Sequence, residues 1–488
     1  MSTTWKPQCD SCRRHVEARY EILEQRICNA CYTRLRWNAS ACPACAQTKV
    51  LAFRSPDGLV VCAACAGVPS RFGCATCGSE QHLTGSHCGR CRLEDRLGDV
   101  LSDTTGQIHP ELAPLREHLL TARDPRSATR WLRHEPIDRT LRDMAQGKKP
   151  VSHHTLNELP QSTRVRYFRH MLISSGTLPN IDVRLNDLEL RTKALTGSIP
   201  PAHAAIITRY FNWEILRRLR RRTGGQPISA GVVNTRTAEI RKIVAFLTWL
   251  DNHGQPLASL EQVTLDHYLS RHDRHKTLAS FLNWAVRNRI TTRLRVPRKQ
   301  PSPPPAPIPE DVVWDKVDGL LNDESTPLPS RIIGLLLLVF AQPIRDSVRL
   351  RLEDIHRNGE VFSLKFGSTP IELPAPITDL LRRHLDETRA RQPYVGEPSG
   401  WLFDGTMPHQ HTSEGGVALH LARQGINARE MKRARLDQLA QVLPASIVAD
   451  VTGVAVETAL RHAIDTSANW GIYPELRASE HGQLNANE

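Results

Sequence analysis

Residues 332–341 read Ile-Ile-Gly-Leu-Leu-Leu-Leu-Val-Phe-Ala, and residues 345–355 read Arg-Asp-Ser-Val-Arg-Leu-Arg-Leu-Glu-Asp-Ile. The first stretch is apolar throughout but far shorter than the roughly 20 residues that span a bilayer, so it predicts a helix buried in a protein core. Apolar segments at 361–366 and 371–373 flank Gly367-Ser368-Thr369, which predicts a β-hairpin. With helical patterns around them, residues 310–475 are expected to form one α/β domain.

A proline-rich segment precedes this domain. Seven prolines occur between Pro297 and Pro309, so we expect a semi-rigid linker at 301–309. Before the linker, Ile240, Ile243 and Leu247 recur at helical spacing and Gly254 ends the pattern. Residues 201–300 therefore predict a compact helical domain.

The basic charge of the chain is concentrated in this helical domain. The net charge is +13, and residues 201–300 contain 18 Lys and Arg against 6 Asp and Glu, a surplus of 12. Such a surplus points to nucleic acid, although a solvated basic face is the plainer interpretation. A helix with Trp213, Leu216 and Leu219 inward would turn its arginines outward. The candidate DNA contacts are Arg217, Arg218, Arg220, Arg221, Arg222, Arg287, Arg289, Arg293, Arg295, Arg298 and Lys299.

All 12 cysteines of the chain lie between residues 9 and 91, in six C-x-x-C motifs. Two such motifs make one tetrahedral S₄ site, which suits Zn²⁺ and leaves no open position for a reactive water. We therefore expect three structural Zn²⁺ ions in an array of zinc fingers at residues 1–95. The ligands are Cys9, Cys12, Cys28, Cys31, Cys42, Cys45, Cys62, Cys65, Cys74, Cys77, Cys88 and Cys91.

Sequential pairing of the motifs is the simplest arrangement, and cross-braced pairing of 9/12 with 42/45 stays open. The second motif of a site is followed by helix-compatible residues, at 32–37 and at 92–97. Cys28-Asn29-Ala30-Cys31 resembles the second knuckle of treble-clef fingers, where it begins a helix. The fingers could contact nucleic acid through Arg13, Arg14, Arg34 and Arg36, or they could bind a protein.

The remaining segments contain fewer signals of structure or function. Residues 96–200 predict short helices of unknown role, and residues 476–488 a disordered tail. Residues 1–6 lack the apolar stretch of a secretory signal, and no segment predicts a membrane span. We expect a cytoplasmic protein, associated with the nucleoid if it binds DNA.

The order of these parts resembles the tyrosine recombinase, or phage integrase, family. In that family a helical core-binding (SAM-like) domain, a basic linker and an α/β catalytic domain form a clamp around DNA. Residues 234–300 resemble the core-binding domain, which ends here in Phe281-Leu282-Asn283-Trp284-Ala285. Residues 308–475 resemble the catalytic domain. The resemblance implies DNA as the partner and a mainly helical, multidomain chain.

The resemblance also implies a set of site residues. In the family two arginines stabilise the phosphate charge, a hairpin lysine is the general acid, and a tyrosine attacks the phosphodiester. Arg345 matches the first arginine, and Lys365 lies in the expected hairpin, before its turn. The family's His-x-x-Arg-His helix corresponds to residues 429–433. Arg429 and Lys432 stand where the family has histidine and arginine, unless Arg433 substitutes.

The nucleophile is where the sequence departs furthest from the family. The register places it near His462, where no tyrosine occurs. Tyr473 follows and could serve only if the last helix were rerouted. Packing beside Trp470 is its plainer role. Tyr394 precedes the arginine helix and is in the wrong order.

Residues 445–463 also support a helix-turn-helix interpretation. It has Gly453 at the turn, Val456 and Leu460 as its apolar positions, and an exposed face that would read bases. That face comprises Glu457, Thr458, Arg461 and His462.

Three hypotheses follow. The first is a zinc-containing DNA-binding protein on a recombinase-like scaffold whose strand cleavage is lost or weakened. The second is an active recombinase or integrase with a divergent site that uses Arg345, Lys365, Arg433 and Tyr473. The third is an adaptor whose fingers bind protein. The charge surplus beside a recombinase-like helical domain favours the first two over the third, and the departures from the motif favour the first.

Overall fold

The computed structural model describes residues 8–272, 275–295, 306–366, 370–390 and 399–465. The chain divides into two compact units that meet in sequence between Pro179 and Asn180. The second unit contains two large hydrophobic cores and a smaller one around Ala341, Leu436 and Val448. We call the residues around the first large core the helical lobe (residues 180–295) and those around the other two cores the mixed lobe (residues 306–465). Helices dominate and the sheets are small, as predicted for a mainly helical, multidomain chain. Within the described ranges, no helix is both long and apolar enough to cross a membrane.

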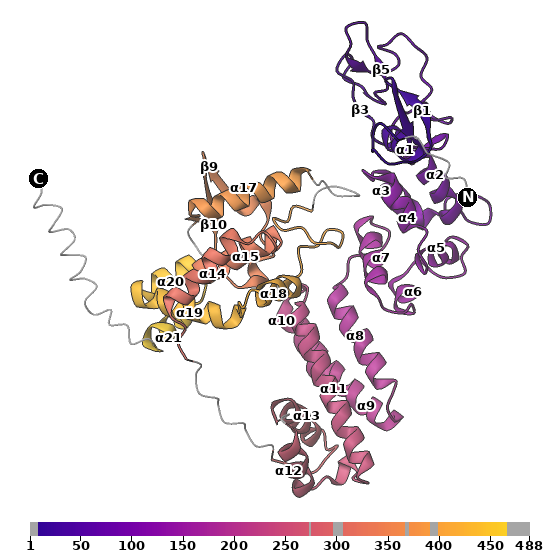
Figure 1. Ribbon diagram of the computed structural model, residues 1–488. Coiled ribbons are helices and arrows are strands. Elements are labelled where there is room, and N and C mark those ends of the chain that lie inside the picture. Colours follow the sequence, from indigo (N-terminus) through magenta and orange to yellow (C-terminus); the bar gives the residue numbers. More distant parts are fainter. Residues whose placement is uncertain (1–7, 273–274, 296–305, 367–369, 391–398, 466–488) are drawn as a thin grey trace, which may run out of the picture. The chain divides into compact units, whose positions relative to one another are not determined.

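The N-terminal unit begins with three fingers, of which the first and third have the same fold and the middle one has a different fold. In the first and third fingers, a C-x-x-C turn precedes a hairpin, and a helix starts inside the second C-x-x-C motif (Figure 1). The middle finger has two short hairpins, and its second motif is followed by turns rather than by a helix. The elements are β1 (Ala18–Ile22), β2 (Gln25–Cys28), α1 (Asn29–Trp37), β3 (Ser40–Ala41), β4 (Thr48–Lys49), β5 (Phe53–Arg54), β6 (Val60–Val61), β7 (Leu83–Thr84), β8 (His87–Cys88) and α2 (Gly89–Leu101).

Helix α2 links the fingers to the rest of this unit, because its inner face starts the next hydrophobic core. Leu93, Leu97 and Leu101 are buried against residues that extend to Leu178. Arg96 and Arg142 join α2 to α5 by ion pairs with Asp99 and Asp138. The helices after α2 are α3 (Ala113–Leu120), α4 (Pro125–Trp131), α5 (Ile137–Ala145), α6 (His153–Asn157) and α7 (Thr163–Ser174).

The helical lobe is built around its longest helix, α11 (Ala230–Asn252), which packs along α8 (Figure 1). Its core begins at Leu188, ahead of residue 201 where the sequence analysis started this domain. Ser229 caps α11 by accepting a hydrogen bond from the Val232 amide, and Gly254 follows its end with a positive φ. The other helices are α8 (Val183–Thr196), α9 (Pro201–Tyr210), a π-helical segment (Phe211–Leu216), α10 (Arg217–Thr223), α12 (Gln262–Arg271) and α13 (His275–Arg287).

One orientation predicted for this lobe is wrong. Leu216 and Leu219 are buried as expected, but Trp213 is 61 % exposed. The π-helical segment is the physical reason, because its wider turn rotates the residues before it relative to those that follow. Trp213 instead lies under the guanidinium of Arg217, with 5.7 Å between ring centroid and Cζ.

The mixed lobe surrounds α15 (Leu328–Phe340), the buried helix that the apolar run predicts. The predicted hairpin is present as β10 (Val361–Lys365) and β11 (Pro370–Glu372), and β9 (Ile355–Asn358) adds a third antiparallel strand to β10. The remaining elements are α14 (Glu310–Asn322), α16 (Ile344–Ser347), α17 (Ala375–Ala390), α18 (Glu414–Arg423), α19 (Ala428–Val442), α20 (Ala445–Thr452) and α21 (Val456–Asp465).

The helix-turn-helix interpretation assigned the wrong face of α21 to the interior. The turn at Gly453 exists, with φ of 71°. However, Ala459 and Ala463 are the buried positions, whereas Val456 and Leu460 are each 47 % exposed. Small side chains let α21 approach α19 and α20 closely, so alanines rather than larger residues face inward.

Candidate metal centres and cationic sites

The 12 cysteines form three four-sulfur clusters, each made by two consecutive C-x-x-C motifs. The clusters are 9/12/28/31, 42/45/62/65 and 74/77/88/91, and the sulfurs of each lie within 4.8 Å of one another. This arrangement confirms sequential pairing and excludes the cross-braced alternative. None of the cysteines forms a disulfide.

The distances between sulfurs fit a tetrahedral metal ion. Sγ–Sγ separations are 3.9 Å for Cys9 and Cys31, 3.8 Å for Cys45 and Cys62, and 3.6 Å for Cys77 and Cys88. Four sulfurs about 2.3 Å from a central Zn²⁺ would be about 3.8 Å apart. The donor set is closed, so such an ion would connect two turns of the chain and could not activate a substrate.

Each cluster also shows a repeated backbone contact. The amide of its third cysteine donates to the sulfur of its first, over 3.2 Å from Cys28 to Cys9 and 3.5 Å from Cys62 to Cys42. Hydrogen bonds from the backbone of Cys12, and then of Cys28, lower the pKa of Cys9 to about 6. Backbone amides that favour thiolate are typical of a metal-binding knuckle.

The basic strip of the helical lobe, Arg217, Arg218, Arg220, Arg221 and Arg222, lies on α10 and is exposed. Part of its charge is already paired. Arg218 contacts Glu214 at 2.6 Å, and Arg220 contacts Glu189 at 3.2 Å. Arg221 and Arg222 have no carboxylate within ion-pair distance among the described residues. The free positive charge of the strip is therefore smaller than its sequence suggests.

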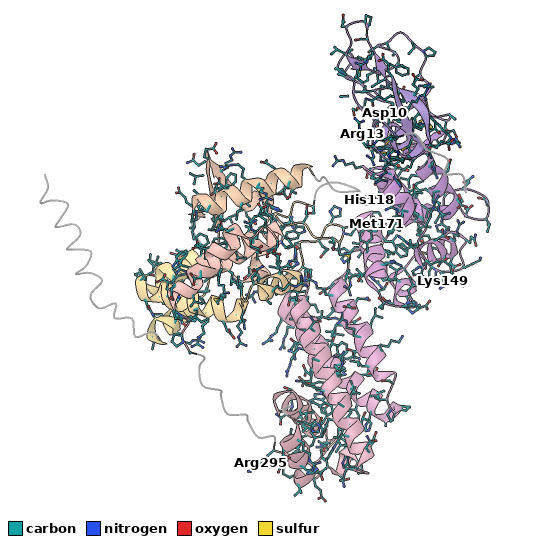
Figure 2. The ribbon with its side chains drawn as sticks, in the orientation of Figure 1. Asp10, Arg13, His118, Lys149, Met171 and Arg295 are labelled. Atoms are coloured by element: carbon teal, nitrogen blue, oxygen red, sulfur yellow. The ribbon has the colours of Figure 1, made fainter. Side chains whose placement is uncertain are left out.

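The other candidate DNA contacts of this lobe lie at the end of α13 and in the segment that follows it. Arg287 pairs with Glu214 at 2.8 Å, so it shares that carboxylate with Arg218. Arg289 and Arg293 are exposed, and Arg295, labelled in Figure 2, is exposed where the described part of the lobe ends. Arg298 and Lys299 lie outside the described residues.

In the mixed lobe, Arg345 on α16 lies near enough to Lys432 on α19 for its charge to act on the lysine. Lys432 is half-buried, and its pKa is lowered, first by burial and then by the positive charge of Arg345. Asp346 is the adjacent carboxylate, 3.2 Å from the Arg345 guanidinium. These two cations are therefore candidates for binding an anion.

The other predicted catalytic residues lie at separate positions in the mixed lobe or outside the described residues. Lys365 is exposed at the end of β10, opposite Pro370, and Arg429 is exposed in the first turn of α19. Arg433 contacts Asp437 at 3.6 Å, one turn further along the same helix. Tyr473 lies outside the described residues.

His462, at the position where the family register expects the nucleophile, is not free on the surface as the helix-turn-helix pattern predicted. Its Nδ1 lies 2.6 Å from an oxygen of Asp437. Asp437 therefore connects His462 with Arg433, a link that sequence reasoning missed because the two helices are 25 residues apart at this contact. Arg461, the neighbouring candidate DNA contact, is exposed.

The chain is similar in structure to tyrosine recombinases and integrases. A complex of XerH site-specific recombinase with difH substrate matches at 12 % identity and a TM-score of 0.37, covering 59 % of this chain and 96 % of that one. Lambda integrase bound to a COC′ core site matches at 13 % identity and a TM-score of 0.29, covering 52 % and 96 %.

The Tn1549 transposon integrase in complex with circular intermediate DNA matches at 12 % identity and a TM-score of 0.30, covering 57 % of this chain and 97 % of that one. No protein-family model and no curated protein matches the sequence.

The lowered pKa of Lys432 gives a stability prediction. Between the folded-state pKa and the ordinary value near 10.4, the unfolded chain binds more protons than the folded chain, so unfolding free energy rises with pH there. Lys432→Met removes the buried charge. We expect the variant to be the more stable at neutral pH and the difference to narrow as pH approaches about 10.4. Urea unfolding at several pH values measures this, and a constant difference would contradict it.

Proposed function

We propose that this protein is a zinc-containing DNA-binding protein on a tyrosine-recombinase-like scaffold, with strand cleavage lost or weakened. Zn²⁺ is the proposed metal because four thiolates at tetrahedral spacing suit it, and each cluster offers only sulfur. The proposal implies a cytoplasmic protein at the nucleoid. It leaves open a protein partner for the fingers.

The observation that carries DNA binding is the pair of cations Lys432 and Arg345. Burial first, and then the charge of Arg345, lower the pKa of Lys432, so its charged form is disfavoured in the empty site. A phosphodiester between the two cations would offset that cost, since its negative charge is shared by two oxygens that can accept from both side chains. The exposed Arg221 and Arg222 of the helical lobe supply further phosphate contacts.

The loss of cleavage is proposed from two other features. A lysine at position 432 is a point charge and cannot make the bidentate contact that an arginine makes with phosphate. The nucleophile position of the family register carries His462, which Asp437 engages at 2.6 Å. These residues could therefore bind the DNA backbone without cleaving a phosphodiester bond.

The alternative is an active recombinase that uses Tyr473, and DNA trapping separates the two. Full-length protein is incubated with nicked duplexes of random sequence, and covalent adducts are sought on denaturing gels. We expect tight binding that weakens by about a thousandfold between 50 and 200 mM salt if six phosphates are contacted, and no adduct.

An adduct formed by the wild type and by Tyr394→Phe, but not by Tyr473→Phe, would show that the chain is an enzyme. Binding that hardly changes with salt would instead favour the third hypothesis, an adaptor whose fingers bind protein.

A further inference from the structure

The N-terminal unit contains a cleft that the proposed function does not use. Its volume is about 650 Å³, and it lies between α1, the start of α2, and α4. Its lining includes Trp37 and five arginines, and no acidic residue. We call these five, Arg34, Arg92, Arg126, Arg130 and Arg133, the arginine cleft.

The three walls of the cleft are fixed by specific contacts. Arg36 of α1 donates to the Gly85 carbonyl of the third finger, and the Trp37 and His82 rings are 4.8 Å apart. Gly89 lets α2 pack closely on its neighbours, since a Cβ at this position would lie 3.2 Å from that of His82 and 3.4 Å from that of Pro125. The cleft therefore needs the first and third fingers to be folded together.

One wall carries a regular array. Asp124 caps α4, and Arg126, Arg130 and Arg133 follow at i, i+4 and i+7, so they share one face of the helix and the turn after it. The array is about 10 Å long and can face two or three successive phosphates of one strand. All five arginines of the cleft are exposed.

These arginines differ from their neighbours in having no acidic partner. Arg96, Arg116 and Arg142 of the same unit each contact carboxylates at 2.5 to 2.7 Å. No carboxylate within the described part of the chain lies within ion-pair distance of the five cleft arginines. The guanidinium of Arg126 lies over an aromatic face, with its Cζ 5.3 Å from the Trp37 ring centroid. Five cations kept together without a counter-charge create a positive potential that attracts an external anion.

We propose that the arginine cleft binds the sugar–phosphate backbone of DNA, as a second contact on a unit separate from the basic strip. The inference rests on the proposed function for its choice of DNA. A regular row of guanidinium groups fits a regular row of phosphates better than it fits an acidic peptide, whose charges have no fixed spacing. Phosphates are the same at every step of the duplex, so a contact made by this row of guanidinium groups with the backbone alone carries no sequence information.

Four full-length proteins and a matched control test the proposal on one random-sequence duplex, by fluorescence anisotropy at several salt concentrations. They are the wild type, a cleft variant (Arg126→Gln, Arg130→Gln, Arg133→Gln), a strip variant (Arg217→Gln, Arg221→Gln, Arg222→Gln) and their combination. The matched control, Arg139→Gln, Lys148→Gln and Arg164→Gln, removes the same charge from exposed positions of the N-terminal unit outside the cleft.

We expect the cleft variant to bind at least tenfold more weakly than the control, and its salt slope to fall by two to three. Circular dichroism and bound-zinc content identify any folding defect. If the cleft variant binds like the control while the strip variant is weakened, the cleft proposal is overturned and the proposed function stands. If only the cleft variant is weakened, the cleft stands and the proposed DNA interface of the helical lobe fails. If the cleft variant keeps wild-type DNA binding but loses binding to an acidic peptide, the cleft is a protein-binding site and the DNA proposal is overturned.

Discussion

Replacing Cys28 with serine is expected to release one of three metal ions and to unfold the first finger. Cys28 is buried, its sulfur is 3.9 Å from that of Cys12, and its amide donates to Cys9. A four-thiolate Zn²⁺ site contributes on the order of 10 kcal/mol to the folding of a small finger, and the finger has little apolar core to replace it. Elemental analysis should give two zinc ions per chain instead of three.

The loss should stay local but should reach the arginine cleft. Limited proteolysis is expected to cut near α1, whereas the mixed lobe, with its own core, stays resistant. Ser40→Ala, an exposed change in the same region, is the control and should keep three ions. Three ions in Cys28→Ser, or an unchanged cleavage pattern, would show that this cluster is not a structural metal site.

The cysteine clusters could be predicted from sequence because their geometry is local. Two residues between cysteines fix each knuckle, so ligand identity followed from spacing alone. The pairing of knuckles did not, because it depends on how the fingers pack. Helix α15 was equally predictable, since an unbroken apolar run between 332 and 340 can only be buried.

Side-chain direction was the part that spacing could not give. Trp213 is exposed because a π-helical turn interrupts the period of the helix. In α21, Ala459 faces the interior instead of Leu460, since close packing there favours the smaller side chain. Both errors came from assuming an ideal helix in which the larger apolar residue is the buried one.

The candidate sites also divide into residues that the sequence could indicate and contacts that it could not. Arg345 and Lys432 were named from the resemblance, and the charge of Arg345 acts on Lys432 although 86 residues lie between them in the sequence. The link between His462 and Asp437 and the arginine cleft were missed, because each joins segments with no shared local pattern. Arginines at i, i+4 and i+7 from Arg126 were the one signal that could have pointed to the cleft.

Arg236→Met is expected to destabilise the helical lobe by roughly 3 kcal/mol. Glu239 is only 7 % exposed, and it pairs with Arg236 at 2.5 Å and accepts from the Tyr210 hydroxyl at 2.7 Å. Removing the arginine leaves a buried carboxylate without a counter-ion, which costs far more than losing a surface ion pair. The value is at the low end for buried pairs because Arg236 itself is partly exposed and Tyr210 still donates.

Glu239→Gln is the matched control, because the amide keeps an acceptor for Tyr210 and the charge left unpaired is that of Arg236, which is partly exposed and can be solvated by water. It should cost about 1 kcal/mol. Urea unfolding followed by the fluorescence of the lobe's tryptophans measures both variants. Because Tyr210 immediately precedes the π-helical segment that leads into the basic strip, Arg236→Met should also weaken DNA binding while Glu239→Gln leaves it near the wild-type value. Equal destabilisation by the two variants would mean that the hydrogen bond, and not the charge balance, stabilises this part of the lobe.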